Sequence, residues 1–219
     1  NLSVILSIIF FILYFFEGIM VYNKFKFFKN TRLQLYKELK KKDQKITVSL
    51  IPQLLKSKKE QIFSLSGISS SKTIDCNESG YYSIYQSDRY GFNNPDKEWD
   101  QNEVEYLLVG DSFVMGNCVN RPNDISSVLR SLSNKPVVNI AYKAMGPLIE
   151  YSALREYSNF KVKKILWFYY EGNDLENLYE ELSNEILLKY LLDNNFTQDL
   201  KGKQKTINNL LIQNIEHEE

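Results

Sequence analysis

Three short apolar runs in the second half of the chain are each followed by small or polar residues. They cover residues 104–109, 137–140 and 165–170, and their Val, Leu, Ile and aromatic content is typical of buried strands. Residues 124–132 and 147–159, which lie between them, carry apolar side chains at helical spacing. Because strand and helix alternate, the pattern predicts an α/β domain with a parallel sheet, right-handed crossovers and helices on both faces.

The amino-terminal segment has a different pattern. Residues 2–16 contain no charged residue, and the apolar run continues to Val21 with Glu17 and Gly18 as interruptions. This length is close to the ~20 residues that cross a bilayer, so we predict a single-pass transmembrane helix over residues 1–22. A cleaved signal peptide, whose apolar region is shorter and ends at small residues, and a buried core helix are the competing interpretations.

Residues 23–75 separate this run from the predicted α/β domain, residues 76–219. Twelve Lys or Arg and two acidic residues fall between positions 24 and 59, although the 219-residue chain has no net charge. We interpret the Lys-rich part as a juxtamembrane helix that could rest on anionic lipid, and residues 46–75 as a connector. A nucleic-acid function is not expected, because the basic run lacks a folded reader.

The chain contains two cysteines, Cys76 and Cys118. They form either a disulfide, which requires an oxidising compartment, or a pair of buried thiols. Two cysteines alone do not decide between these alternatives, because the spacing says nothing about their distance.

The predicted strands end in residues that can carry chemistry. Gly110-Asp111-Ser112 follows the first strand, a loop that contains Gly146 follows the second, and Gly172-Asn173-Asp174 follows the third. Each segment alone also fits an ordinary turn. However, the carboxyl ends of parallel strands meet at one edge of the sheet, where open α/β folds place their ligands. The convergence of all three segments therefore favours a functional site.

These segments resemble the first three sequence blocks of the SGNH/GDSL hydrolase superfamily, and residues 88–93 resemble the lead-in of its membrane-anchored bacterial members. The resemblance covers residues 88 to about 180 and implies a flavodoxin-like three-layer α/β/α fold. By position, it implies that Ser112 is the nucleophile beside the carboxylate of Asp111. The backbone N–H of Ser112 and the side-chain amide of Asn173 would stabilise the oxyanion of the tetrahedral intermediate, which needs fixed donors.

The chain departs from this family at two positions. Ala144 stands where the family has the Gly of its oxyanion loop, and because Ala tolerates positive φ poorly, Gly146 is the alternative donor. The family's general base is the His of an Asp-x-x-His motif, but the only histidine is His217, with Asn214 at the Asp position. We interpret His217 as a solvated tail residue, and expect the base and the last strands of the sheet beyond Glu219.

The resemblance thus implies a membrane-anchored serine esterase or acyl hydrolase that forms an acyl-enzyme on Ser112, with its catalytic domain on the extracytoplasmic, periplasmic side. By the positive-inside rule the Lys-rich residues 24–45 would instead keep the domain in the cytoplasm, so the orientation stays open. The expected substrate is an ester of a small molecule, a lipid or a glycan. By resemblance, O-acyl groups of cell-envelope glycans are one such class. No metal or organic cofactor is implied. A non-catalytic binding module of the same fold and an O-acyltransferase that uses the same Ser are the alternatives.

Overall fold

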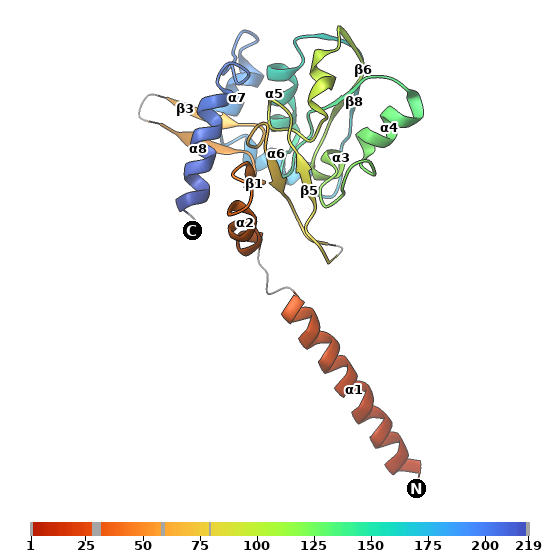
Figure 1. Cartoon of the computed structure of the whole chain (residues 1–219). Helices are drawn as coiled ribbons and strands as arrows, with labels where there is room; N and C mark the ends of the chain where they lie inside the picture. Colours follow the sequence, from red (N-terminus) through yellow and green to blue (C-terminus); the bar gives the residue numbers. More distant parts are fainter. Residues whose placement is uncertain (1, 28–31, 58–59, 79, 218–219) are drawn as a thin grey trace.

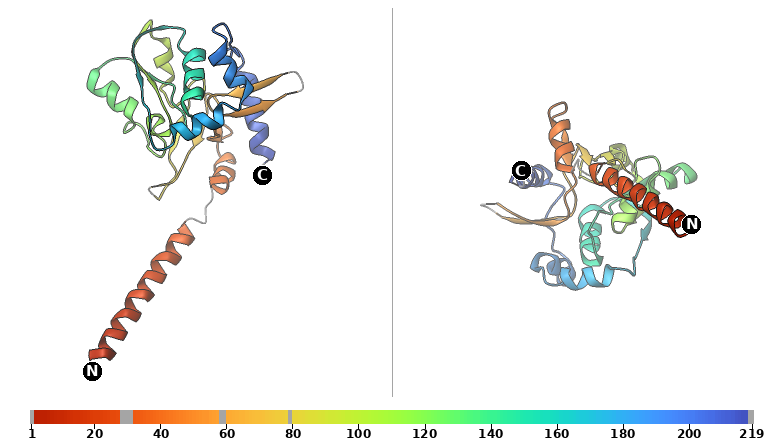
Figure 2. Two further views of the ribbon diagram at one scale, coloured as in Figure 1. Left: turned by 180° about the vertical axis from the view of Figure 1, so that it is seen from behind. Right: turned by 90° about the horizontal axis from the view of Figure 1, so that it is seen from below.

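The computed structural model describes residues 2–27, 32–57, 60–78 and 80–217, without the side chains of residues 2–6, 21–27 and 217. Helix α1 (Leu2–Phe27) leads away from a folded body that the later residues form (Figures 1 and 2). Helix α2 (Arg32–Lys40) belongs to that body, because it contacts β1 (Ile46–Val48) and buries Tyr36.

The strands of the described chain form three sheets. In the first, β6 (Glu103–Val109) lies between β7 (Val137–Asn139) and β8 (Lys161–Trp167), and both pairs are parallel. In the second, β4 (Lys72–Ile74) pairs in parallel with β1 and antiparallel with β5 (Ile84–Gln86). The third is an antiparallel hairpin of β2 (Gln53–Lys56) and β3 (Gln61–Ser64).

The prediction of a single flavodoxin-like parallel sheet is therefore wrong, although the three strands on which it rested do pair in parallel. Residues 46–75, which we expected to be a connector, form β1 to β4 instead. These strands are three or four residues long, too short to produce a sustained period in the sequence. Their apolar side chains, such as Ile62 and Ile74, are nevertheless almost completely buried.

Helices lie on both faces of the parallel sheet. They are α3 (Ser112–Met115), α4 (Ile125–Ser133), α5 (Pro147–Tyr157), α6 (Asp174–Glu181) and α7 (Glu185–Leu192); the 3-10 helix η1 (Asp96–Asp100) and α8 (Gln204–His217) lie elsewhere. Trp167 in β8 bonds to Glu150 in α5, whereas Phe168 lines a cavity with residues of α3 and α4. Because successive strand residues point to opposite faces, α5 lies on one face and α3 and α4 on the other.

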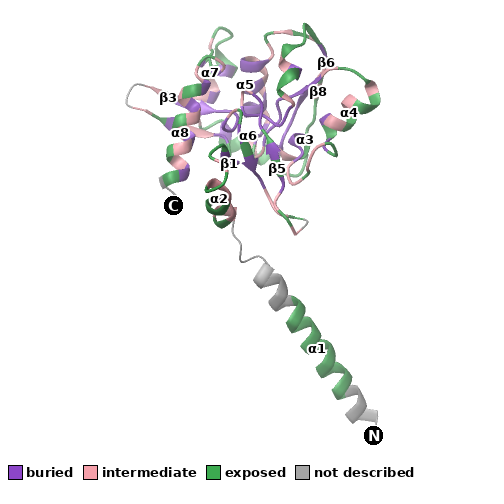
Figure 3. Ribbon diagram, in the orientation of Figure 1, coloured by how far each residue is buried: buried purple, intermediate pink, exposed green. Residues whose placement is uncertain are grey.

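The prediction of a transmembrane anchor over residues 1–22 is contradicted. In the part of the chain that the structure describes, no helix is both long and apolar enough to cross a bilayer. The described side chains of α1 run from residue 7 to residue 20 and are exposed (Figure 3). Single-pass anchoring and the membrane localisation derived from it are thus not supported.

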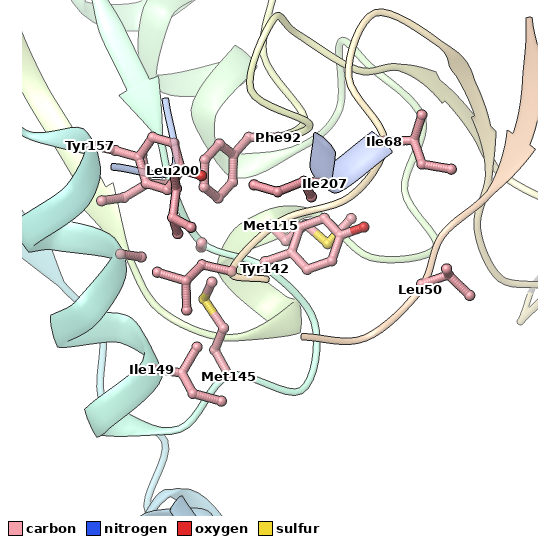
Figure 4. Close-up of a cluster of buried hydrophobic side chains, with 14 of the residues drawn as sticks. Leu50, Ile68, Phe92, Met115, Tyr142, Met145, Ile149, Tyr157, Leu200 and Ile207 are labelled. Atoms are coloured by element: carbon pink, nitrogen blue, oxygen red, sulfur yellow. The ribbon is translucent and has the colours of Figure 1, made fainter. Parts of the chain in front are cut away.

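One hydrophobic core joins the three sheets. Figure 4 shows a part of it, in which Leu50 and Ile68 from the first half of the chain lie with Tyr142 and Met145 from the loop after β7. Leu200, Ile207 and other residues of the carboxyl-terminal region complete the cluster. Because this core spans the sequence from 36 to 215, the parallel sheet is not a separate unit.

Cys76 and Cys118 form a disulfide, with their Cα atoms 5.0 Å apart. Of the two alternatives left open by the sequence, the bridge is the one present. It joins the segment after β4 to the segment after α3, and therefore connects two of the sheets close to the end of β6.

Candidate active site

The segment after β6 places Ser112 at the first position of α3. Gly110 has no room for a side chain, since a Cβ there would lie 2.5 Å from Cγ2 of Val114. Asp111 is the N-cap residue, and its carboxylate accepts a hydrogen bond from the Phe113 N–H at 2.9 Å. Ser112 is half-buried, and among the described residues its hydroxyl has no hydrogen-bond partner. Asp111 thus starts the helix that presents Ser112.

The loop after β7 is tied to α3 by Asn139. Its buried side chain donates to the carbonyl of Val114 at 2.6 Å and accepts from the N–H of Ala141 at 2.9 Å. Asn94 in turn bonds to the backbone of Asn139, accepting from its N–H at 2.9 Å and donating to its carbonyl at 2.8 Å. The sequence did not indicate these roles, because Asn94 lies among ordinary turn formers and is 45 positions away from Asn139. Together they fix the loop relative to α3.

Ala144 adopts the left-handed conformation, with φ of 53°. This conformation costs an L-residue about 1–2 kcal/mol, which is why the sequence placed the orientation of this donor in doubt. Ala144 is exposed, and no hydrogen bond to its N–H is found among the described residues. The loop therefore takes the backbone conformation that a Gly would favour, and presents an unpaired donor.

Gly146, the alternative donor, is already engaged. Its N–H donates to Oε1 of Glu181 at 2.7 Å, and Oε2 of the same carboxylate accepts from the N–H of Leu148 at 2.8 Å. A Cβ at Gly146 would lie 2.5 Å from Cβ of Asn177. Gly146 thus allows α6 to pack against the first turn of α5, and the available donor in this loop is that of Ala144.

Asn173 follows β8 at the N-cap position of α6, but its side chain makes no capping hydrogen bond and is exposed. Asn173 therefore occupies the cap position without capping the helix. The neighbouring Asp174 is buried and accepts from the N–H of Tyr170 at 2.6 Å, which closes the turn that carries Asn173.

Acidic side chains surround this end of the sheet. Burial raises the pKa of Glu150 to about 8, although Trp167 donates to its Oε2 at 2.5 Å, and Asp174 and Asp111 raise the pKa further. Burial also raises the pKa of Asp111, with a contribution from Asp174. Within the described residues, no three His, Cys, Asp or Glu side chains are grouped so as to hold a metal ion.

Two cavities lie at the end of β8. One, of about 230 Å³, is bordered by the nucleophile segment and the aromatic residues after β8: Asp111, Phe113, Val114, Ile125, Phe168, Tyr169 and Tyr170. The other, of about 370 Å³, is apolar and lies on the α5 face: Pro147, Leu148, Tyr151, Trp167, Leu178, Leu182 and Leu191. The smaller cavity is lined by the residues on both sides of Ser112, so it lies beside the start of α3.

The structure places the single histidine of the chain away from the edge of the parallel sheet where Ser112 lies. His217 is the last residue of α8, which contacts β2, and its side chain lies outside the described residues. The surrounding segment is not a solvated tail, because Leu211 and Ile215 of α8 are buried in the core. The sequence pattern Ile207, Leu211 and Ile215, at four-residue spacing, indicates this buried face.

Comparisons of the chain with known protein families, with curated proteins and with solved structures find no match in any of the three. The assignment to the SGNH/GDSL superfamily therefore rests on the three sequence blocks alone.

Proposed function

We propose that the protein is a serine esterase or acyl hydrolase in which Ser112 is the nucleophile. The observation that carries the proposal is the order β7-β6-β8 of the parallel sheet. It puts Ser112 after the central strand, with the Ala144 loop and Asn173 after the strands on either side. A nucleophile between two sources of oxyanion donors is the arrangement that acyl transfer requires.

The reaction follows from these groups. The Ser112 hydroxyl oxygen attacks the ester carbonyl, and the N–H of Ala144 and the amide of Asn173 donate to the negatively charged oxygen that develops. Collapse of the intermediate expels the alcohol, which takes the proton of Ser112, and leaves an acyl-serine that water hydrolyses. Removal of the proton from the Ser112 hydroxyl needs a general base. In the resembled family the His of an Asp-x-x-His motif is this base, and the residues that carry the resemblance, 88–180, do not contain that motif.

The cavity beside Ser112 favours a small, uncharged acyl group. Its volume of about 230 Å³ is below the usual range of drug-sized ligand sites, and its walls include three aromatic residues after β8. Phe113 and Tyr170 pack against each other in its wall, with ring centroids 5.3 Å apart. We therefore propose short-chain esters as substrates, whether the alcohol part is a small molecule, a glycan or a lipid.

Hydrolysis of p-nitrophenyl acetate by the purified protein tests this proposal. We expect Ser112→Ala to lower kcat by about a thousandfold or more, because the nucleophile cannot be replaced by its neighbours. Ser131→Ala is the matched control: it removes an exposed hydroxyl from α4 and leaves the rate unchanged. Equal rates for the wild type and Ser112→Ala would contradict the proposal.

A non-catalytic binding module is the second candidate, favoured by the absence of a hydrogen-bond partner for the Ser112 hydroxyl in the described residues. Such a module would bind esters at the same cavity without cleaving them. Calorimetric binding of an ester with no turnover by the folded protein would support it. An acyltransferase is distinguished from both by an acyl product that appears only when an acceptor alcohol is added.

A further inference from the structure

Lys143, next to Ala144, is held by a buried ion pair. Its Nζ lies 2.9 Å from Oδ1 of Asp75, and the two side chains are 13% and 2% exposed. Ser49 donates its hydroxyl to the same carboxylate oxygen at 2.7 Å, and Lys143 also donates to the Ser49 hydroxyl. The ammonium group is thus bound at two points in the interior of the protein.

The partners of Lys143 belong to another sheet. Ser49 directly follows β1 and Asp75 directly follows β4, which is the parallel neighbour of β1. Burial lowers the pKa of Lys143 and the negative charge of Asp75 opposes that shift, so the site disfavours the ammonium unless the carboxylate is present. A buried pair broken by removal of one partner leaves an uncompensated charge. The loop after β7 is therefore fastened to the β1-β4-β5 sheet.

The second oxygen of Asp75 holds the segment that follows the nucleophile helix. Oδ2 accepts from the N–H of Cys118 at 3.4 Å, and the Asn117 amide, with its nitrogen toward Asp75, donates to it at 2.6 Å. The adjacent Cys76 is covalently bonded to Cys118. One carboxylate thus connects the loop of Ala144 with the segment that leaves α3.

The left-handed conformation of Ala144 needs such support. A non-glycine residue persists in a sparsely populated backbone region only where the surroundings fix it. After Ala144, the N–H of Gly146 is bound by Glu181. Before it, Lys143 is bound by Asp75, so the loop is fixed on both sides of the residue with positive φ.

We propose that Asp75 and Lys143 are positioning residues that hold Ala144 in its left-handed conformation and so aim its N–H at the oxyanion formed by attack of Ser112. The inference rests on the proposed function, because it gives the ion pair a purpose in the acyl-transfer step. Neither residue touches the substrate: Lys143 and Asp75 act through the backbone of the loop.

Three variants test the pair by kinetics with p-nitrophenyl acetate. Lys143→Met keeps the length of the side chain and removes its charge, and Asp75→Asn keeps the shape of the carboxylate. Lys143→Arg keeps a positive charge at this position. The matched control is Lys72→Met in β4, which removes a more exposed ion pair, the one between Lys72 Nζ and Asp43 Oδ2 at 2.8 Å. We expect the first two to lower kcat about tenfold with KM within about twofold. Lys143→Arg recovers most of the rate, and Lys72→Met leaves it unchanged.

Hydrogen exchange of the folded proteins provides a readout that does not depend on activity. We expect amides of residues 140–145 to exchange about tenfold faster in Lys143→Met than in the wild type or Lys72→Met, because the loop opens more often. Unchanged exchange in that loop overturns the proposal, whether or not the wild type hydrolyses esters. Faster exchange with an unchanged kcat also overturns it, since the loop then does not serve the reaction. If the wild type does not turn over and Ser112 is unreactive, the proposed function fails, and exchange alone decides whether the pair holds the loop.

Discussion

Strands β6 and β8 lie side by side in register, yet their environments differ. Leu107 in β6 is opposite Ile165 in β8; Leu107 is fully buried, whereas Ile165 is 48% exposed. Trp167 at the end of β8 is 45% exposed, and the three aromatic residues that follow it are also exposed. Apolar burial stabilises by roughly 25 cal/mol per Å², so β6 contributes far more to the stability of the sheet than β8.

The same difference divides the candidate site. Ser112 and the Ala144 loop lie beside β6 and β7, where Asn139, Asn94 and Asp75 fix the backbone through buried hydrogen bonds. Asn173 lies at the end of β8, where its side chain is exposed and makes no capping bond. One half of the candidate site is thus held by buried hydrogen bonds, whereas the Asn173 side chain in the other half is exposed to solvent.

The largest difference in stability is expected between Leu107→Ala and Ile165→Ala. Leu107→Ala creates a cavity in the core and lowers the free energy of unfolding by about 2–5 kcal/mol. Ile165→Ala removes a half-exposed side chain at the register-matched position and costs about 1 kcal/mol or less. Urea denaturation of both variants checks the difference. Similar losses would show that β8 is as well packed as β6.

The next effect is on catalysis at the exposed half of the site. Asn173→Ala is expected to lower kcat about 100- to 1,000-fold, which corresponds to ~2.7–4 kcal/mol of barrier, because it removes an oxyanion donor. The melting temperature stays at the wild-type value, since the side chain makes no capping bond. Asn195→Ala, which removes another exposed amide, is the control. A fall in melting temperature without loss of kcat would assign Asn173 a structural role.

Asn139→Ala tests the fixed half of the site. It leaves the Val114 carbonyl and the Ala141 N–H without their partner, so the free energy of unfolding falls by about 1–3 kcal/mol. Because α3 and the Ala144 loop are no longer joined, kcat falls as well. Thermal unfolding and steady-state kinetics are measured on the same preparation. A variant with wild-type stability would contradict the role of Asn139 as the tie between loop and helix.

A further effect is a dependence of stability on pH. Glu150 has a pKa of about 8 in the folded protein against 4.5 ordinarily. The folded state therefore binds its proton more tightly, and this contribution to stability is complete below pH 4.5 and is lost as the pH rises through 8. We expect the wild type to lose stability relative to Glu150→Gln over that window. Asp111, Asp174 and Glu181 face position 150 in both proteins. Their own contributions to the pH dependence therefore largely cancel when the stability of Glu150→Gln is subtracted from that of the wild type. If the free energy of unfolding of the two proteins changed in parallel with pH, the prediction would be contradicted.

The sequence located the parallel strands from short runs that are rich in apolar residues and bounded by turn formers. The run at 165–170 nevertheless overlaps only the last three residues of β8 (Lys161–Trp167). The sequence could not predict β1 to β4, since three or four residues show no period and their pairing depends on contacts far apart in the chain. A long apolar run also predicted a membrane span, but apolar composition alone does not define one.

The candidate residues at the strand ends could be predicted because parallel strands bring their carboxyl ends to one edge. The contacts that hold these residues in place could not be predicted. Asn94 and Asp75 lie 45 and 68 positions from their partners Asn139 and Lys143. The engagement of Gly146 by Glu181 is likewise a contact across 35 positions, which no local pattern reveals.

Reaction with a fluorophosphonate probe tests the central claim most directly. The probe phosphonylates an activated serine, and peptide mapping by mass spectrometry locates the adduct. The account predicts one adduct, on Ser112, which is absent from Ser112→Ala and present in Ser131→Ala. A folded wild-type protein that carries no adduct, or carries it on another serine, would contradict the assignment of Ser112 as the nucleophile.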